Sequence, residues 1–202
     1  MGALVYFLVG YSQLWLAALV AYFCGCFNGA VRTFGGPLTV VVILTDVLKA
    51  IVAILVSVWL GGLFDPRILP TTPLENQAMI LVFFKYWGGL FCLLGHMFPC
   101  MFHFKGGKGI LSGGTIAIMI DWRVALVVWG GFLILAVLTR YVSLGSCWAG
   151  ASFPFITWFV YRSVPVTVLA VIIGGLILYM HRGNIHRLLT GTENKFTLHK
   201  KS

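Results

Sequence analysis

The chain has 202 residues, of which 60% are hydrophobic and 9% are charged, and 14 Lys+Arg against 5 Asp+Glu give a formal net charge of +9. Soluble domains contain about 25% charged residues, so this composition excludes a soluble globular protein and is typical of an integral membrane protein. The basic residues lie between apolar runs and in the C-terminal tail, which favours membrane orientation and anion binding over nucleic-acid binding.

Seven apolar runs follow one another along the chain, and each is a candidate transmembrane helix. The runs cover residues 3–24, 38–61, 78–98, 110–120, 124–139, 141–161 and 165–181. A transmembrane helix needs about 20 apolar residues, so the fourth and fifth runs are short, as is tolerated where a helix lines a cavity or is buried in protein. The runs predict an all-α polytopic membrane protein with about seven transmembrane helices. Because the sequence shows neither a repeat nor a linker, we predict a single domain, residues 1–202.

Seven spans would place the two termini on opposite sides of the membrane, and the basic residues indicate which side is cytoplasmic. If the N-terminus is outside, nine lysines and arginines lie in inner segments, namely Arg32, Lys105, Lys108, Arg140, Arg182, Arg187, Lys195, Lys200 and Lys201. Only three then lie in outer segments, namely Arg67, Arg123 and Arg162. Since cytoplasmic loops carry the excess of basic residues, we predict an outer N-terminus and a cytoplasmic C-terminus.

Two ionisable residues lie inside the second run. Asp46 and Lys49 in LTDVLKA are three residues apart, so they share one side of a helix. Charged groups inside a membrane are costly and are therefore paired or functional. We expect the two side chains to pair as a structural brace, an interpretation favoured over a direct catalytic role.

The segment GHMFPCMFHFKGGKGI, residues 95–110, interrupts the apolar pattern between the third and fourth runs. Three of its four glycines and both of its lysines lie close together near its end, namely Gly106, Gly107, Gly109, Lys105 and Lys108. The glycines allow several backbone N–H groups to point into one concave nest, and the helix that follows adds its positive N-terminal end. The segment therefore predicts an anion site, and a plain basic loop against anionic lipid is the alternative.

A nucleotide-binding P-loop does not fit this segment. The Gly-Lys pair is followed by Gly109 instead of serine or threonine, and position 102 is phenylalanine instead of glycine. The expected anion is therefore a small phosphate ester or an acyl phosphate.

Two further polar segments are predicted on the same side of the membrane. RYVSLGSC, residues 140–147, opens the sixth run and contains Ser143, whereas YMHRGNIHRLLTGTE spans residues 179–193. In the second segment His181, Asn184 and Arg187 are three apart on a helix that continues the last run and stops at Gly191. An imidazole, an amide and a guanidinium on one side suit a phosphate or a glycerol hydroxyl, although each residue alone is as well explained by an interfacial position.

The cysteines give no sign of a metal site or a disulfide. Cys24, Cys26, Cys92, Cys100 and Cys147 contain no CxxC pair, and all lie in or beside apolar runs. We expect them to be small buried hydrophobic residues.

Together these segments resemble one family, the bacterial membrane acyltransferases that use acyl phosphate to acylate glycerol 3-phosphate. The matching segments are LTDVLKA, GHMFPCMFHFKGGKGI, RYVSLGS and HRGNIHRLLTGTE, in the family's order. The resemblance implies seven transmembrane helices in the bacterial inner membrane and an active site on the cytoplasmic side. It also implies transfer of the acyl group to the 1-hydroxyl, which gives lysophosphatidic acid and phosphate, the first step of phospholipid synthesis, without metal or other cofactor.

The resemblance also implies roles for individual residues. His96 and the loop of Gly106, Gly107 and Gly109 would hold phosphate, whereas Lys108, Ser143, His181 and Asn184 would hold glycerol 3-phosphate. Arg187 is a further substrate-binding candidate, and His96, Lys108 and His181 are the candidates for catalysis. Both histidines titrate in a range useful for a general base, but the resemblance suggests the substrate's own phosphate as an alternative proton acceptor. Gly191 and Glu193 would shape the C-terminal loop.

One segment departs from the family's pattern. Such enzymes carry a loop of the form GSGNxGxTNxxR between the first two helices, which helps to hold the acyl phosphate, and this chain has only CGCFNGAVRTFGG at residues 24–36. Asn28, Gly29 and Arg32 correspond to parts of that loop, and Arg32 is the substrate-binding candidate here. The serine and the second asparagine are missing.

Two other functions fit the same features. A transporter or binding protein for a phosphorylated solute or lipid would use the same anion loop between short helices. An inactive subunit that partners another enzyme of phospholipid synthesis would retain the motifs without the reaction. Formation of lysophosphatidic acid distinguishes the acyltransferase from both, and the sequence predicts neither the oligomeric state nor the acyl-chain preference.

Overall fold

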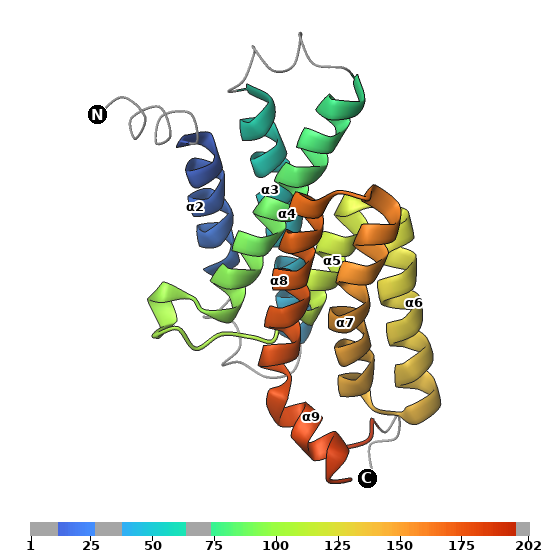
Figure 1. Ribbon diagram of the computed structural model, residues 1–202. Helices are drawn as coiled ribbons and strands as arrows, with labels where there is room; N and C mark the ends of the chain where they lie inside the picture. Colours follow the sequence, from blue (N-terminus) through green and yellow to red (C-terminus); the bar gives the residue numbers. More distant parts are fainter. Residues whose placement is uncertain (1–11, 27–37, 64–73, 197–202) are drawn as a thin grey trace, which may run out of the picture. The chain divides into compact units, whose positions relative to one another are not determined.

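The computed structural model describes residues 12–26, 38–63 and 74–196, and every regular element within these ranges is a helix (Figure 1). The elements are α2 Ser12–Cys26, α3 Leu38–Leu63, α4 Leu74–Met97, the 3-10 turn η2 Cys100–Phe102, α5 Ile110–Ile120, α6 Trp122–Thr139, α7 Val142–Tyr161, α8 Val164–Met180 and α9 Arg182–Leu189. The all-α class predicted from the apolar runs is therefore confirmed for the described chain.

Each of the seven predicted runs overlaps with one of these helices. By length and apolar composition, three spans among the described residues are long enough to cross a membrane: Val40–Gly62, Ala78–Phe102 and Trp122–Thr139. A fourth results if α8 and α9 count as one span, because they form a helix pair bent by 60°. The described part of α2 and all of α5 are shorter, with 15 and 11 residues. The number of spans predicted from the sequence remains a prediction.

The chain divides into two compact units, residues 1–119 and residues 120–202, which we describe separately. In the first unit α2, α3 and α4 pack against one another. The indole Nε1 of Trp87 on α4 donates to the backbone oxygen of Leu14 on α2 at 2.8 Å, and the hydroxyl of Ser57 on α3 donates to the backbone oxygen of Phe84 at 2.8 Å. These bonds satisfy polar atoms that would otherwise be buried in an apolar interior.

Helices α2 and α4 approach closely where each carries a glycine. A Cβ atom at Gly25 would overlap with the backbone oxygen of Cys92, and one at Gly95 would overlap with the backbone oxygen of Tyr22. Small residues at such a crossing let two helix backbones touch, which is a main source of helix association in a membrane. The crossing fixes the C-terminal end of α4, from which the glycine-rich loop begins.

In the second unit α7 packs between α6 and α8, and α9 contacts both α7 and α8. Asp121 caps the N-terminus of α6, because its carboxylate accepts from the backbone N–H of Arg123 at 2.8 Å and from the Arg123 Nε at 3.0 Å. The hydroxyl of Tyr161 at the end of α7 donates to the same carboxylate at 3.3 Å. One carboxylate thus joins the start of α6 to the end of α7.

Helices α7 and α8 cross where Gly150 faces Gly174. Pro154 lies inside α7, one turn after Gly150. Its Cδ atom lies 3.3 Å from the position that a Cβ atom at Gly174 would occupy. A Cβ atom at Gly174 would overlap with the backbone oxygen of Gly150. The crossing is therefore closed by backbone contact.

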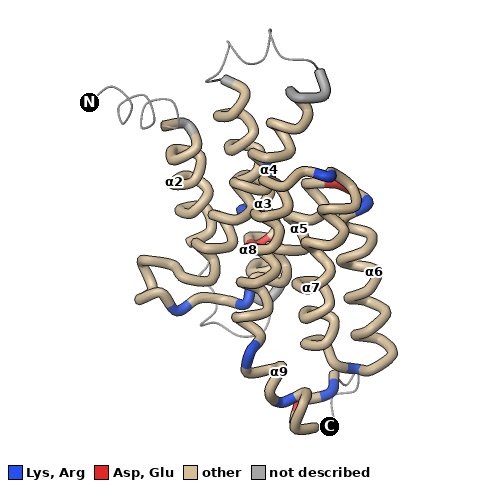
Figure 2. The backbone as a smooth tube through the Cα atoms, viewed as in Figure 1, with Lys and Arg blue, Asp and Glu red and all other residues tan. Residues whose placement is uncertain are grey.

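The helix surfaces carry many exposed apolar side chains. On α6 the exposed fractions reach 73% for Val137 and 77% for Leu138. In the second unit the lysines, arginines and acidic residues gather at the helix ends, and the tube between them is tan (Figure 2). Exposed apolar surface of this extent indicates contact with lipid.

Candidate functional site

The glycine-rich loop of the first unit folds back onto the end of α4. After the 3-10 turn, His103 and Phe104 adopt left-handed backbone conformations with φ of 51° and 58°. The N–H of Gly106 then donates to the oxygen of Met97 at 3.0 Å, and the N–H of Gly107 donates to the oxygen of His96 at 3.1 Å. These two N–H groups satisfy carbonyls at the C-terminus of α4, so they are not the anion donors that a nest would require.

Glycine is needed in this loop because the backbone lies directly against His96. A Cβ atom at Gly106 would overlap with the His96 oxygen, and one at Gly107 would overlap with the imidazole Nε2. Gly109 has a φ of +73°, a region that favours glycine. The loop therefore holds one defined position over the imidazole ring.

The two lysines of the loop are exposed and lie just before a helix. Lys105 and Lys108 are exposed, and α5 begins at Ile110. The N–H of Gly113 donates to the Gly109 oxygen at 2.7 Å, which closes the first turn of that helix. Two cations beside a helix N-terminus make a positive surface suited to a phosphate.

Below the loop, Asp46 and Lys49 on α3 form the predicted pair. Lys49 Nζ lies 2.6 Å from Asp46 Oδ1, which confirms that the two side chains pair. The structure adds a third member, because Lys49 Nζ also lies 2.5 Å from Nδ1 of His96. The three side chains are buried, at 7%, 7% and 9% exposure for Asp46, Lys49 and His96. The sequence pattern within α3 contained no signal for this contact with α4.

The polar groups of the second unit meet at one carboxylate. Glu193 Oε1 accepts from the Ser143 hydroxyl at 2.6 Å and from the Asn184 amide at 2.7 Å. Glu193 Oε2 accepts from the Arg187 Nε at 2.7 Å. Ser143, Asn184 and Arg187 thus lie together as their predicted shared role requires, and Glu193, expected only to shape the loop, is their common partner.

The surroundings of Glu193 favour its charged form. The hydrogen bond from Ser143 is the largest cause, followed among the favourable ones by those from Asn184 and Arg187, and together they lower the pKa of Glu193 from 4.5 to about 2. Burial opposes this shift without cancelling it. The carboxylate is therefore ionised at neutral pH.

The loop that carries Glu193 is fixed at both sides. Gly191 has a φ of +70°, and the N–H of Thr192 donates to the Arg187 oxygen at 2.9 Å, so the predicted helix end at Gly191 is confirmed. Further along, the N–H of Phe196 donates to the oxygen of Arg140 at 2.8 Å. The segment after α9 is thereby tied to the start of α7.

His181 lies at the bend between α8 and α9. The sequence predicted an uninterrupted continuation of the last run, but the two helices meet at 60°. His181 is 3% exposed, and its Nδ1 lies 2.8 Å from the oxygen of Ile177. A carbonyl only accepts, so Nδ1 of His181 carries a proton.

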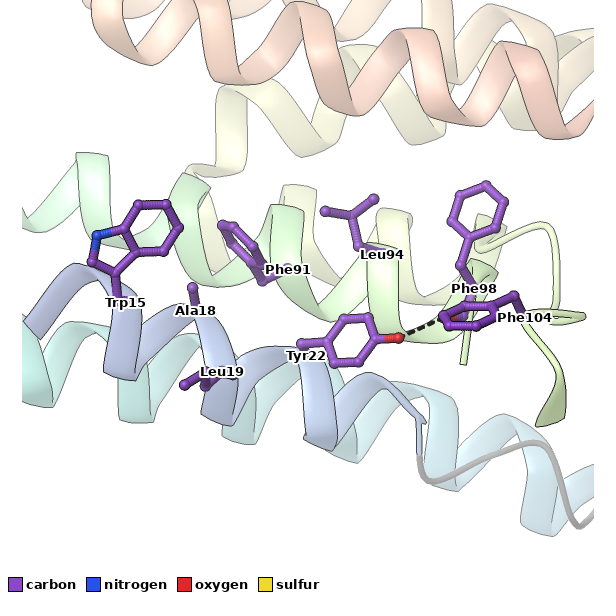
Figure 3. A pocket seen from close by; sticks show the side chains of 8 residues that line it. All are labelled: Trp15, Ala18, Leu19, Tyr22, Phe91, Leu94, Phe98 and Phe104. Atoms are coloured by element: carbon purple, nitrogen blue, oxygen red, sulfur yellow. Dashed lines mark hydrogen bonds between the residues drawn. The ribbon is translucent and has the colours of Figure 1, made fainter. Parts of the chain in front are cut away.

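An apolar groove runs along α2 and α4 in the first unit (Figure 3). Its volume is about 390 Å³, within the range of small-molecule pockets. The lining residues are Trp15, Ala18, Leu19, Tyr22, Phe91, Leu94, Phe98 and Phe104. The Tyr22 hydroxyl donates to the Phe98 oxygen at 2.7 Å, which joins α2 to the chain between α4 and the glycine-rich loop. The groove therefore leads toward that loop.

Some expectations fall elsewhere. Arg32, Asn28, Gly29 and most of the 24–36 segment lie outside the described residues. The five cysteines are free thiols, but only Cys26 and Cys92 are buried as expected, because Cys24 and Cys147 are half-buried and Cys100 is exposed. Within the described ranges, no group of three histidine, cysteine or acidic side chains is arranged to hold a metal ion.

Comparisons with known proteins point to one family. Residues 24–191 match the family described as glycerol-3-phosphate acyltransferase. The chain is 38% identical over 170 residues to the glycerol-3-phosphate acyltransferase of Aquifex aeolicus, with 82% of this chain and 77% of that protein covered. It is 33% identical over 165 residues to that of Fusobacterium nucleatum, with 82% and 76% covered.

Solved structures give a consistent result. The glycerol 3-phosphate form of PlsY (YgiH), an integral membrane glycerol 3-phosphate acyltransferase, matches with a TM-score of 0.71 at 29% identity. The match covers 91% of this chain and 96% of that one. The lysophosphatidic acid form of the same enzyme matches with a TM-score of 0.72, also at 29% identity, and covers 91% and 95%.

Proposed function

The chain belongs to the glycerol-3-phosphate acyltransferase family, and on this premise we propose that it moves an acyl group from acyl phosphate to the 1-hydroxyl of glycerol 3-phosphate. The products are lysophosphatidic acid and inorganic phosphate. The observation that carries the proposal from the geometry is the loop fixed over His96, which presents exposed Lys108 at the start of α5. A site of this kind suits a substrate with a phosphate group.

The reaction needs little covalent help from the protein. The substrate hydroxyl oxygen attacks the acyl carbon, the bond between that carbon and the phosphate oxygen breaks, and the departing phosphate takes the hydroxyl proton. Acyl phosphate is already activated, so the protein must hold the two substrates in line and offset the negative charge that develops. Lysine and backbone or side-chain N–H donors perform this task.

The residues are assigned by this chemistry together with the family resemblance. Lys108 neutralises phosphate charge, and His96 with Gly106, Gly107 and Gly109 defines the loop around it. Ser143, His181, Asn184 and Arg187 bind glycerol 3-phosphate. Glu193 keeps Ser143, Asn184 and Arg187 together through the three hydrogen bonds described above. Arg32 remains a candidate for the acyl phosphate.

The apolar groove of the first unit is assigned to the acyl chain. The side chains that line the groove are apolar, apart from two that carry one polar group each. These are Trp15, whose indole is exposed, and Tyr22, whose hydroxyl donates to the Phe98 oxygen. The groove leads to the chain segment that ends in the glycine-rich loop, so a donor with its phosphate at the loop can lay its chain along α2 and α4. Burial of each CH₂ group stabilises such a complex by about 0.8 kcal/mol.

The same proposal includes the arrangement in the membrane. Seven transmembrane helices, with the N-terminus outside and the reactive loop facing the cytoplasm, agree with nine basic residues in inner segments against three in outer segments. The membrane is then the bacterial inner membrane, where both substrates are available on the cytoplasmic side.

The activity is tested with purified protein, acyl phosphate and glycerol 3-phosphate. We expect release of phosphate together with lysophosphatidic acid, and a loss of kcat/KM of about 100-fold in Lys108→Ala, because a cation beside the developing charge is removed. Arg123→Ala is the matched control, since Arg123 is also an exposed cation but lies in the other unit beside Asp121. Uptake of glycerol 3-phosphate into vesicles without acylation would instead establish a transporter.

The groove assignment has its own test. Leu94→Trp fills part of the groove and is expected to shift the preference toward shorter acyl phosphates. Leu133→Trp is the control, because Leu133 is an exposed residue of α6 outside the groove. An unchanged ratio of long-chain to short-chain activity in Leu94→Trp would place the acyl chain elsewhere.

A further inference from the structure

The contacts of His96 indicate which of its two ring nitrogens carries the proton. We infer that Lys49, itself held by Asp46, fixes His96 as a neutral imidazole with its proton on Nε2. His96 is then a hydrogen-bond donor toward the glycine-rich loop and not a general base. The donor's target, a bound phosphate, rests on the proposed function, whereas the position of the proton does not.

The partners of Lys49 indicate that its amino group is charged. Its Nζ has three acceptors around it: Asp46 Oδ1 at 2.6 Å, His96 Nδ1 at 2.5 Å and the Gly25 oxygen at 3.5 Å. An ammonium group has three N–H donors and no acceptor, so three accepting partners fit its charged form. The buried carboxylate of Asp46 compensates that charge.

Nδ1 of His96 accepts a hydrogen bond from Lys49. Because the ammonium group of Lys49 only donates, Nδ1 must accept, and it cannot carry a proton of its own. The competing arrangement has a protonated Nδ1 that donates to Asp46 Oδ1, but that distance is 3.4 Å, against 2.5 Å to Lys49. A proton on Nδ1 would also face the Lys49 cation at this short distance. A neutral imidazole with its proton on Nε2 is therefore the favoured form.

Nε2 of His96 faces the glycine-rich loop. A Cβ atom at Gly107 would meet Nε2 before any other atom of the protein, so this nitrogen faces the loop backbone. Cδ2, the ring carbon bonded to Nε2, lies 3.6 Å from the position that a Cβ atom at Gly109 would occupy. The Nε2–H group therefore faces Gly107, the residue before Lys108.

His181 provides the opposite case within the same chain. Its Nδ1 lies 2.8 Å from a carbonyl oxygen, so Nδ1 carries the proton there. The two buried histidines are thus held in different tautomers by different partners. The two histidines therefore cannot play the same part. Nε2 of His96 already bears a proton, and Lys49 opposes protonation of its Nδ1, so His96 has no nitrogen available as a base.

Lys49 and Asp46 are accordingly positioning residues, which act through His96. Nitrogen NMR of protein labelled with ¹⁵N-histidine tests the assignment directly at neutral pH. In the unaltered protein we expect His96 to show an unprotonated Nδ1 and a protonated Nε2, while His181 shows the reverse. The His96→Gln variant identifies the His96 resonances. A protonated Nδ1 at His96 would overturn the inference, whether or not the protein has acyltransferase activity.

Variants of Lys49 test what holds the tautomer. Lys49→Met combined with Asp46→Asn removes the ammonium group without leaving a buried unpaired charge. In this double variant the His96 signals should report a mixture of tautomers or an imidazolium, and in Lys49→Arg, which keeps a cationic donor, they should remain as in the unaltered protein. Unchanged His96 signals in the double variant would show that another partner fixes the ring.

Two substitutions of His96 test the donor role in catalysis. Gln places an amide N–H near the former Nε2 but cannot take up a proton, whereas Ala removes the donor. We expect His96→Ala to lose about 100-fold in kcat and His96→Gln to retain at least about ten times more activity than the alanine variant. Equal losses in the two variants would contradict the donor role, and an inactive unaltered protein would refute the proposed function alone.

Discussion

The crossing of α7 and α8 in the second unit offers a test in which two neighbouring glycines differ. A Cβ atom at Gly174 would overlap with the backbone oxygen of Gly150, whereas one at Gly175 would have no other atom within 4 Å. Both residues lie inside α8, so replacing either by alanine gives the same gain in helix propensity, about 0.5–1 kcal/mol. The difference between the variants isolates the crossing of α7 and α8.

The expected difference follows from the kind of atom that is met. A backbone oxygen inside a helix cannot turn away, so the two helices must separate to admit the methyl group, and such overpacking costs about 1–3 kcal/mol. Each kcal/mol shifts the unfolding temperature by about 2–4 °C for a chain of this size. Gly174→Ala should therefore unfold about 2–12 °C below Gly175→Ala.

Thermal unfolding of the detergent-solubilised variants, followed by tryptophan fluorescence, measures this difference. A second matched pair on α6 extends the test, because a Cβ atom at Gly131 would overlap with the Trp148 indole and one at Gly130 would meet nothing within 4 Å. Here the obstacle is a side chain that can move, so the expected difference is smaller. If Gly174→Ala is as stable as Gly175→Ala, the two helices do not touch through their backbones.

Three further predictions follow from the ends of the helices. The pKa of Glu193 is lowered in the folded protein, so its hydrogen bonds add stability that is complete above pH 4.5 and is lost as the pH falls toward about 2. The unfolding temperatures at pH 7 and pH 3 should therefore differ more in the unaltered protein than in Glu193→Gln. Asp121→Ala should cost about 1 kcal/mol of stability through the lost N-cap, and it should cost more than Arg123→Ala, as measured by thermal unfolding. Exposed Cys100 should react with a membrane-impermeant maleimide in inside-out vesicles and not in right-side-out ones, because its loop is predicted to face the cytoplasm.

The positions of the helices could be predicted because lipid leaves the backbone little choice. An apolar segment at membrane depth must satisfy its N–H and C=O groups internally, so each apolar run predicts a helix. The fourth run, residues 110–120, coincides with α5, and the sixth and seventh begin and end within one residue of α7 and α8. The bend of 60° at His181 was not predicted, because the apolar pattern does not distinguish a bent pair of helices from one continuous helix.

The candidate site was predictable only as separate pieces. The pairing of Asp46 with Lys49 follows from a spacing of three within one helix, but the contact of Lys49 with His96 depends on how α3 and α4 pack. Likewise the glycines of the loop indicated backbone freedom, and the sequence could not show that two of their N–H groups would be used by the carbonyls at the end of α4. Glu193 had the residue type of an acceptor, and its three donors come from two helices.

The proline in α7 has a consequence for the neighbouring helix. Pro154 has no N–H, so it cannot donate to the oxygen of Gly150 as an ordinary residue would four positions along a helix. In hydrocarbon, where water cannot hydrate that oxygen, an uncovered carbonyl would cost several kcal/mol. The bare Cα of Gly174 lies against it, and a Cα–H group is a weak donor to a carbonyl. The glycine of α8 thus shields a dipole that the proline of α7 exposes.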